Sequence, residues 1–299
     1  MFWASAAKIS AVFPERRTLL QSDVSFFARE IRPMPHSLAD QPPLINALAP
    51  LGFNPGKNGA HAARTLMLGE ITSLLTQTGV GCGRSDYAQA VTEENVLSKS
   101  TASSRKRTFE HLVSLYAMDR KVPIFRLLCH FWELDLQGRA LILLAAARAR
   151  DPLLELGTEF ILALSVGEKF DRTAFERFIE EKFPGRFSKK MRRSLAQNIA
   201  STFTQVGFLE GKIHKVRRHP KTSVGAVALS LALSKLAGIH GISAWQSPWA
   251  RILCLSVGAG DEAAREASRR GWIDYRRIGE VVSLSFRHLA EDLQIPELA

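Results

Sequence analysis

The fold is decided by one stretch, residues 186–221, which reads RFSKKMRRSLAQNIASTFTQVGFLEGKIHKVRRHPK. It contains ten Lys and Arg residues but a single acid, Glu210. Its first half has the period of a helix, since apolar residues recur every three or four positions: Met191, Leu195, Ile199, Phe203 and Val206. Ser188 is suited to cap this helix and Gly207 to end it. The sequence therefore predicts an amphipathic helix with a basic outer face.

A second amphipathic helix precedes it over Ala174–Phe183, with Asp171 as the expected N-cap. Only Pro184–Phe187 separates the two helices, which is the layout of a helix-turn-helix. The segment Lys212–His219, which lies between a glycine and a proline, alternates in the way that is typical of a β-ribbon or wing. The alternative is a solvated basic helix followed by a loop.

Ten cations on adjoining elements attract phosphates and release counterions. We therefore expect duplex DNA as a partner, held mainly through phosphates, with at most weak reading of bases through Arg193 and Gln197. The contact residues predicted in this stretch are Lys189, Lys190, Arg192, Arg193, Gln197, Lys212, Lys215, Arg217 and Arg218.

A second candidate for phosphate contact is the helix that begins near Ser100 or Thr101. A helix N-terminus with free N–H groups and nearby cations can hold a phosphate. The residues predicted to contribute are Lys99, Arg105 and Arg107. Ordinary capping with solvated bases explains the same pattern.

Composition narrows the class of protein. The 299 residues carry a net charge of +11 and are 46% hydrophobic, which suits a folded protein with a polyanionic partner. Three widely spaced cysteines form neither a disulfide framework nor a zinc set, so we expect a reducing cytoplasm and no metal or cofactor. The most apolar stretch, Val224–Leu236, has 13 residues and is typical of a buried helix rather than a membrane span.

The pattern predicts an all-α fold with one small β element. Residues 1–60 contain seven of the 13 prolines and are expected to be a loosely structured extension, with residues 41–60 as a linker. An upstream start codon, with Met34 or Met67 nearer the true beginning, is the alternative for this extension. Residues 61–167 are expected to form a first helical domain and residues 168–299 a second. Helices are predicted to end the chain over Pro248–Val257, Asp261–Gly271 and Arg276–Leu293, and a short strand is predicted at Ile273–Tyr275.

The stretch Glu94–Arg107, ENVLSKSTASSRKR, resembles the signature of BrxA-type proteins from bacterial BREX phage-exclusion loci. Further matching segments follow in the family's order: Leu115-Tyr116, Pro123–Phe125 with Trp132, Arg150–Leu154, and Ser201–Gly211 with Lys212 and Lys215. The similarity covers about residues 65–290. It implies a helical fold compared to that of NusB, DNA binding, no catalysis, and other BREX-system proteins as partners. Residues 1–60 make this chain longer than the typical member.

Three other functions remain open at this point. A helix-turn-helix transcriptional regulator would use the same elements as a symmetric dimer on a palindrome. A scaffold within a defence complex would co-purify with its partners. A nuclease would need converging carboxylates for a metal, whereas Glu93, Glu94, Asp119, Asp135 and Asp151 are scattered at predicted helix ends. We therefore expect no enzyme activity.

Overall fold

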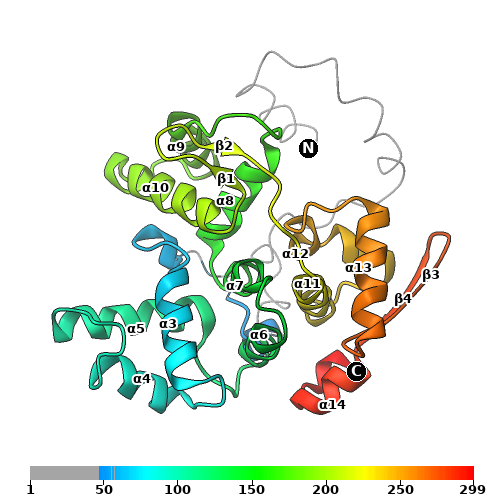
Figure 1. Ribbon diagram of the computed structural model, residues 1–299. Coiled ribbons are helices and arrows are strands. Elements are labelled where there is room, and N and C mark those ends of the chain that lie inside the picture. The colour runs from blue at the N-terminus through cyan, green and yellow to red at the C-terminus, as the bar shows by residue number, and fades with distance from the viewer. Residues whose placement is uncertain (1–46, 55, 57) are drawn as a thin grey trace, which may run out of the picture. The chain divides into compact units, whose positions relative to one another are not determined.

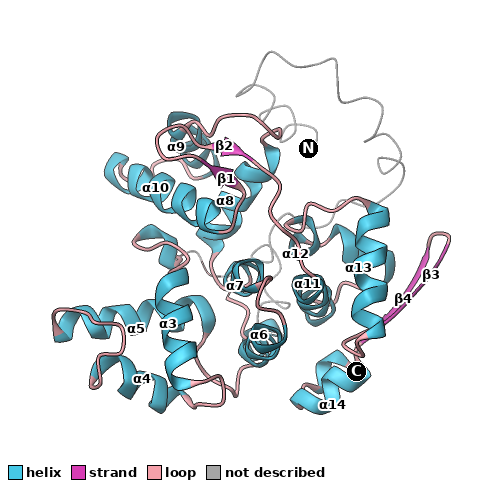
Figure 2. Cartoon of the chain, viewed as in Figure 1, coloured by secondary structure: helices cyan, strands magenta, loops and turns pink. Residues whose placement is uncertain are grey.

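A computed structural model describes residues 47–54, 56 and 58–299 of the chain. These residues form a mainly helical fold with two small antiparallel sheets (Figures 1 and 2), and they belong to one compact unit, residues 41–299. The first part contains α3 (Leu68–Thr78), α4 (Arg84–Thr92), α5 (Ala102–Tyr116), α6 (Pro123–Leu134) and α7 (Arg139–Arg148). The second part contains α8 (Pro152–Ala163), α9 (Arg172–Lys182), α10 (Lys189–Gln205), β1 (Leu209–Glu210) and β2 (Val216–Arg217). The third contains α11 (Val224–Leu236), α12 (Pro248–Arg251), α13 (Val257–Arg269), β3 (Asp274–Ile278), β4 (Val281–Ser285) and α14 (Arg287–Leu293).

The expected linker is partly a core segment. Residues 1–46 lie outside the described residues, but Leu48, Leu51 and Phe53 are buried. The Phe53 ring lies edge-on to Trp249, with 5.5 Å between the ring centroids, and the Asn54 N–H donates to the Ala149 carbonyl. Apolar side chains between the prolines therefore anchor residues 47–54. The linker prediction was wrong for these residues because it considered the prolines and not the apolar side chains between them.

The helix α8 positions α10 through a close contact between the two. Gly157 of α8 lies so near Ile199 of α10 that a Cβ at residue 157 would overlap the Ile199 side chain. The predicted boundary at residue 167 falls in the loop between α8 and α9, which also pack together through Phe160, Phe175 and Phe178. Aromatic burial of this kind favours a fixed arrangement of the three helices.

The segment after α8 joins the first hairpin. Lys169 forms a bridge with Val216, the Phe170 N–H donates to the Lys215 carbonyl, and the Arg217 N–H donates to the Glu168 carbonyl. β2 therefore pairs with β1 on one side and with residues 167–170 on the other. This pairing fixes the hairpin beside α9 and α10 in place of a loop.

The predicted helix Arg276–Leu293 is wrong over its first half. Residues 274–278 and 281–285 pair as an antiparallel hairpin, with Ile278 opposite Val281, and only Arg287–Leu293 is helical. The β-branched residues of this segment favour a strand. Gly279 has a φ of +57°, and this backbone conformation suits glycine in the turn.

The order of elements in the second part recurs in the third. Helix α8, a short connecting segment, α9, α10 and the hairpin β1–β2 are followed by α11, the 3-10 helix Gly241–Gln246, α12, α13 and the hairpin β3–β4. Each unit thus presents a long helix followed by a hairpin. Figure 1 shows β3–β4 extending alongside α13.

Candidate nucleic-acid interface

Helix α10 is held by its buried face and presents a polar face to solvent. The Ser188 hydroxyl accepts a hydrogen bond from the Met191 N–H at 3.2 Å, as the predicted cap requires. Leu195, Ile199 and Phe203 are buried. The exposed side chains include Lys189, Lys190, Arg193 and Gln197, and none of these four has a hydrogen-bond or ion-pair partner among the described residues. Their polar groups are therefore available to a ligand.

Arg192 differs from that set because its guanidinium has partners within the protein. Its guanidinium forms an ion pair with Glu180 of α9 and donates to the Phe187 carbonyl at 2.7 Å. These contacts tie the start of α10 to α9. Arg192 therefore stabilises the turn between the helices, in contrast to the predicted phosphate contact.

Arg217 is a correction to the predicted site. Only 3% of its surface is exposed, its Nε donates to the Ile161 carbonyl at 3.2 Å, and Nη2 lies 3.2 Å from Cys254 Sγ. The guanidinium also stacks over the Phe208 ring at 4.8 Å. Alternation along β2 turns residue 217 inward, so Arg217 is an anchor and cannot meet a phosphate. The sequence shows the alternation but not which side faces the core.

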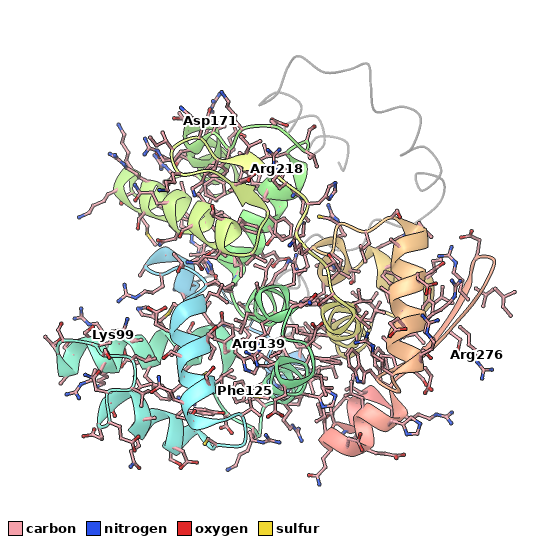
Figure 3. The ribbon with its side chains drawn as sticks, in the orientation of Figure 1. Lys99, Phe125, Arg139, Asp171, Arg218 and Arg276 are labelled. Carbon is pink, nitrogen blue, oxygen red and sulfur yellow. The ribbon has the colours of Figure 1, made fainter. Side chains whose placement is uncertain are left out.

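The other predicted residues of the hairpin differ in availability. Lys215 Nζ donates to Thr204 Oγ1 at 2.7 Å and to the Gly211 carbonyl at 3.3 Å, and burial lowers the pKa of Lys215. Arg218, labelled in Figure 3, is exposed but forms an ion pair with Glu210 at 2.7 Å. Lys212 is exposed and has no partner among the residues that the structure describes.

The second predicted site, at the start of α5, offers fewer free cations. Thr101 is the N-cap, and its hydroxyl accepts from the Ser104 N–H. Lys99 Nζ lies 3.1 Å from Glu70 Oε1, and Arg105 reaches the Glu93 carbonyl at 3.5 Å. Arg107 is exposed and, within the described part of the chain, makes no ion pair. Of the three predicted residues, therefore, Arg107 alone is fully available.

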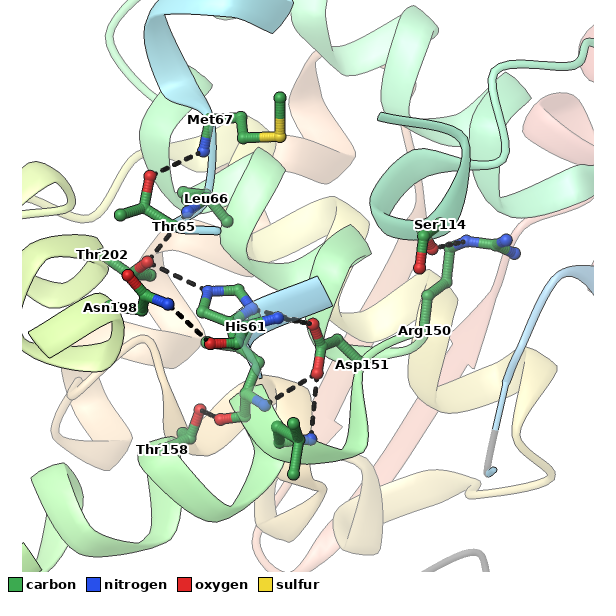
Figure 4. Close-up of polar contacts among 12 residues, drawn as sticks. His61, Thr65, Leu66, Met67, Ser114, Arg150, Asp151, Thr158, Asn198 and Thr202 are labelled. Atoms are coloured by element: carbon green, nitrogen blue, oxygen red, sulfur yellow. Dashed lines mark hydrogen bonds and ion pairs between the residues drawn. The ribbon is translucent and has the colours of Figure 1, made fainter. Parts of the chain in front are cut away.

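Sequence reasoning missed a buried polar network beneath α10 (Figure 4). His61 Nδ1 lies 2.8 Å from Asp151 Oδ2, and His61 Nε2 lies 3.0 Å from Thr202 Oγ1. The Leu66 N–H donates to the same Thr202 oxygen at 2.9 Å. These contacts are mutually consistent if His61 carries its proton on Nδ1 and accepts from the Thr202 hydroxyl.

This network connects three segments that are distant in the sequence. The side chains of His61 and Asp151 are 0% and 1% exposed, so the pair is closed to solvent. Burial by itself raises the pKa of Asp151, but the adjacent His61 and the hydrogen bonds from His61 and Leu154 together lower it below its ordinary value. Asp151 also caps α8, as predicted, by accepting from the N–H groups of Leu153 and Leu154. The His-Asp-Thr set therefore links the start of α8 to the last turn of α10.

The charge of the two helix-hairpin units differs. Residues 171–221, from α9 to the hairpin β1–β2, contain 13 Lys and Arg against 5 Asp and Glu, whereas residues 248–285, from α12 to the hairpin β3–β4, contain 6 Lys and Arg against 5 Asp and Glu. On α13, Glu262 and Glu266 pair with Arg269, and Glu266 also pairs with Arg270. The basic surface is thus confined to the first unit of the pair.

Two findings about the described residues concern metal binding and membrane insertion. They contain no group of three or more His, Cys, Asp or Glu side chains placed to hold a metal ion. None of their helices has both the length and the apolar character needed to cross a bilayer. No protein-family model matches the chain, and neither does any curated protein sequence.

Proposed function

We propose that this protein binds duplex DNA through residues 152–221, which act as a winged helix-turn-helix. The observation that carries the proposal is the exposed row Lys189, Lys190, Arg193 and Gln197, unpartnered within the described part of the chain, on a capped helix beside an antiparallel hairpin. In winged and other helix-turn-helix proteins the second helix enters the major groove while flanking elements contact the backbone.

The residues divide by task. Lys189, Lys190 and Lys212 act on phosphates, which position the protein without reading sequence. Arg193 and Gln197 lie one helical turn apart, and both side chains have the donors needed to bond base edges in the major groove. Arg192 and Arg217 contribute indirectly. Arg192 stabilises the turn between α9 and α10, and Arg217 stabilises the hairpin.

The similarity to BrxA-type proteins supports a wider setting for this binding. In that setting the protein is a non-enzymatic accessory of a BREX-type antiphage system, and other BREX proteins are its partners. Its helices then have an arrangement similar to that of NusB. Genes for a phosphatase-like PglZ protein, a large ATPase and a methyltransferase are then expected beside its own gene.

Affinity for a labelled duplex at several salt concentrations tests the DNA proposal. Neutralising about three phosphates, one each for Lys189, Lys190 and Lys212, gives a slope of log K against log salt of about −2.7, which corresponds to about 40-fold weaker binding at 200 mM than at 50 mM salt. Absence of binding at 50 mM salt, or equal binding at both concentrations, contradicts the proposal.

A triple charge reversal, Lys189→Glu with Lys190→Glu and Arg193→Glu, is the matching variant. All three side chains are exposed and unpartnered in the described structure, so we expect lost DNA binding and an unchanged melting temperature. Arg265→Glu on α13 is the control, because this residue lies outside the basic unit. A symmetric dimer on a palindromic site, if found, favours the transcriptional regulator instead.

A further inference from the structure

The most exposed large hydrophobic side chains of the described residues lie at the ends of the two hairpins. Ile213, between β1 and β2, is 89% exposed, and Ile278 and Val281, at the turn of β3–β4, are 83% and 72% exposed. Exposed apolar groups of this kind gain from contact with a partner. The surroundings of each hairpin tip indicate which partner.

The first tip lies within the basic part of the chain and next to an exposed lysine. Ile213 stands between Lys212 and His214, both exposed, within the unit that carries 13 cations against 5 acids. The second tip contains Glu280 and belongs to the unit with 6 Lys and Arg against 5 Asp and Glu. Only the first tip therefore combines an isoleucine with a cationic setting.

Contacts within the protein restrict the conformation of the first tip. Gly211 has a φ of +110° and packs so closely on the His214 carbonyl that a Cβ would overlap it. Lys215 Nζ ties the loop to Thr204 of α10, and the buried Arg217 secures the strand below. A tip that is already ordered loses little conformational entropy on binding.

We propose that the loop Gly211–His214 enters the minor groove of DNA and that Ile213 packs against sugars and base edges there. Apolar side chains that enter the minor groove widen it, partly unstack a base step and bend the duplex, while flanking cations bind the phosphates along the groove walls. Lys212 supplies such a cation. This inference rests on the proposed function and adds to it a second groove and an expected bend in the DNA.

The test compares two isoleucine variants of the full-length protein, Ile213→Ser and Ile278→Ser. Each removes one highly exposed apolar side chain from a hairpin tip, so neither should unfold the protein, and a melting curve for each verifies this. Binding to a duplex with donor and acceptor dyes at its ends gives affinity and bend together. Netropsin, which occupies the minor groove of A·T-rich DNA, serves as the competitor.

We expect Ile213→Ser to bind about tenfold more weakly and to reduce the bend, Ile278→Ser to behave as the wild type, and netropsin to compete with the wild type. If the wild type binds DNA but Ile213→Ser binds and bends it equally and netropsin has no effect, the minor-groove inference is overturned and the proposed function stands. If Ile278→Ser is the weaker variant, the inference is also overturned, because the contact then belongs to the second hairpin. If the wild type does not bind DNA at all, both the proposed function and the inference fail.

Discussion

Arg217 was predicted from the sequence to contact phosphate, whereas in the fold it is a buried anchor, and these two roles predict opposite effects when the side chain is removed. As a phosphate contact its removal would weaken DNA binding and leave stability unchanged. As a buried anchor its removal should do the reverse. Arg217→Ala and Arg217→Met test the two roles, with the adjacent exposed residue in Arg218→Ala as the matched control.

The expected magnitude follows from the contacts of Arg217. The charge-assisted hydrogen bond to the Ile161 carbonyl contributes about 1.5–3 kcal/mol. The stack on Phe208 contributes about 0.5–2 kcal/mol. Removal of a buried cation whose Nη1 has no partner in the described structure offsets part of this loss.

We therefore expect Arg217→Ala to lower the free energy of unfolding by about 2–3 kcal/mol, since it also leaves a cavity. At about 2–4 °C per kcal/mol this corresponds to a fall in melting temperature of about 5–10 °C. Arg217→Met keeps the volume of the side-chain stem, so its loss should be smaller, about 1 kcal/mol. Arg218→Ala should stay within about 0.5 kcal/mol of the wild type.

Urea denaturation followed by circular dichroism measures these losses, and DNA affinity is measured on the same preparations at a temperature where all variants are folded. The reasoning is refuted if Arg217→Met is as stable as the wild type but binds DNA as weakly as the charge-reversed α10 variant. Such a result would place Arg217 on the DNA surface.

Two further predictions concern the buried network and the second basic site. The pKa of folded Asp151 lies below its ordinary value, so the ionised carboxylate stabilises the fold above the unfolded pKa, about 3.9, and this contribution is lost as pH falls through the folded pKa. Asp151→Asn should lower the free energy of unfolding by about 3 kcal/mol at pH 7 and make stability depend less on pH in the acid range. If stability and its pH dependence are unchanged in Asp151→Asn, the carboxylate does not have this role. Replacing Arg105 and Arg107 with Glu should weaken DNA binding less than the α10 reversal, because Arg107 alone of the predicted cations there is free in the described structure; a larger loss in folded protein would move the DNA surface to the first helical part of the chain.

Local rules were sufficient for most helices and their caps. Asp151, Asp171 and Ser188 cap α8, α9 and α10 as predicted, because a cap needs only a short side chain three or fewer residues from the free N–H groups. The mainly helical fold followed from the 3.6-residue spacing of apolar residues. The basic character of residues 186–221 is likewise a property of the sequence alone.

Tertiary structure decided which of these cations are available to a ligand. Arg193 and Arg217 are both arginines in one basic stretch, but one faces solvent and the other is enclosed by α8, Phe208 and Cys254. Alternation in a strand leaves two faces, and only packing selects the buried one. The same limit applies to His61 and Thr202, which are 141 residues apart and become partners only when α10 packs over the chain before α3. The sequence by itself determined the charge and the helices, and the long-range packing determined which charged groups a ligand can reach.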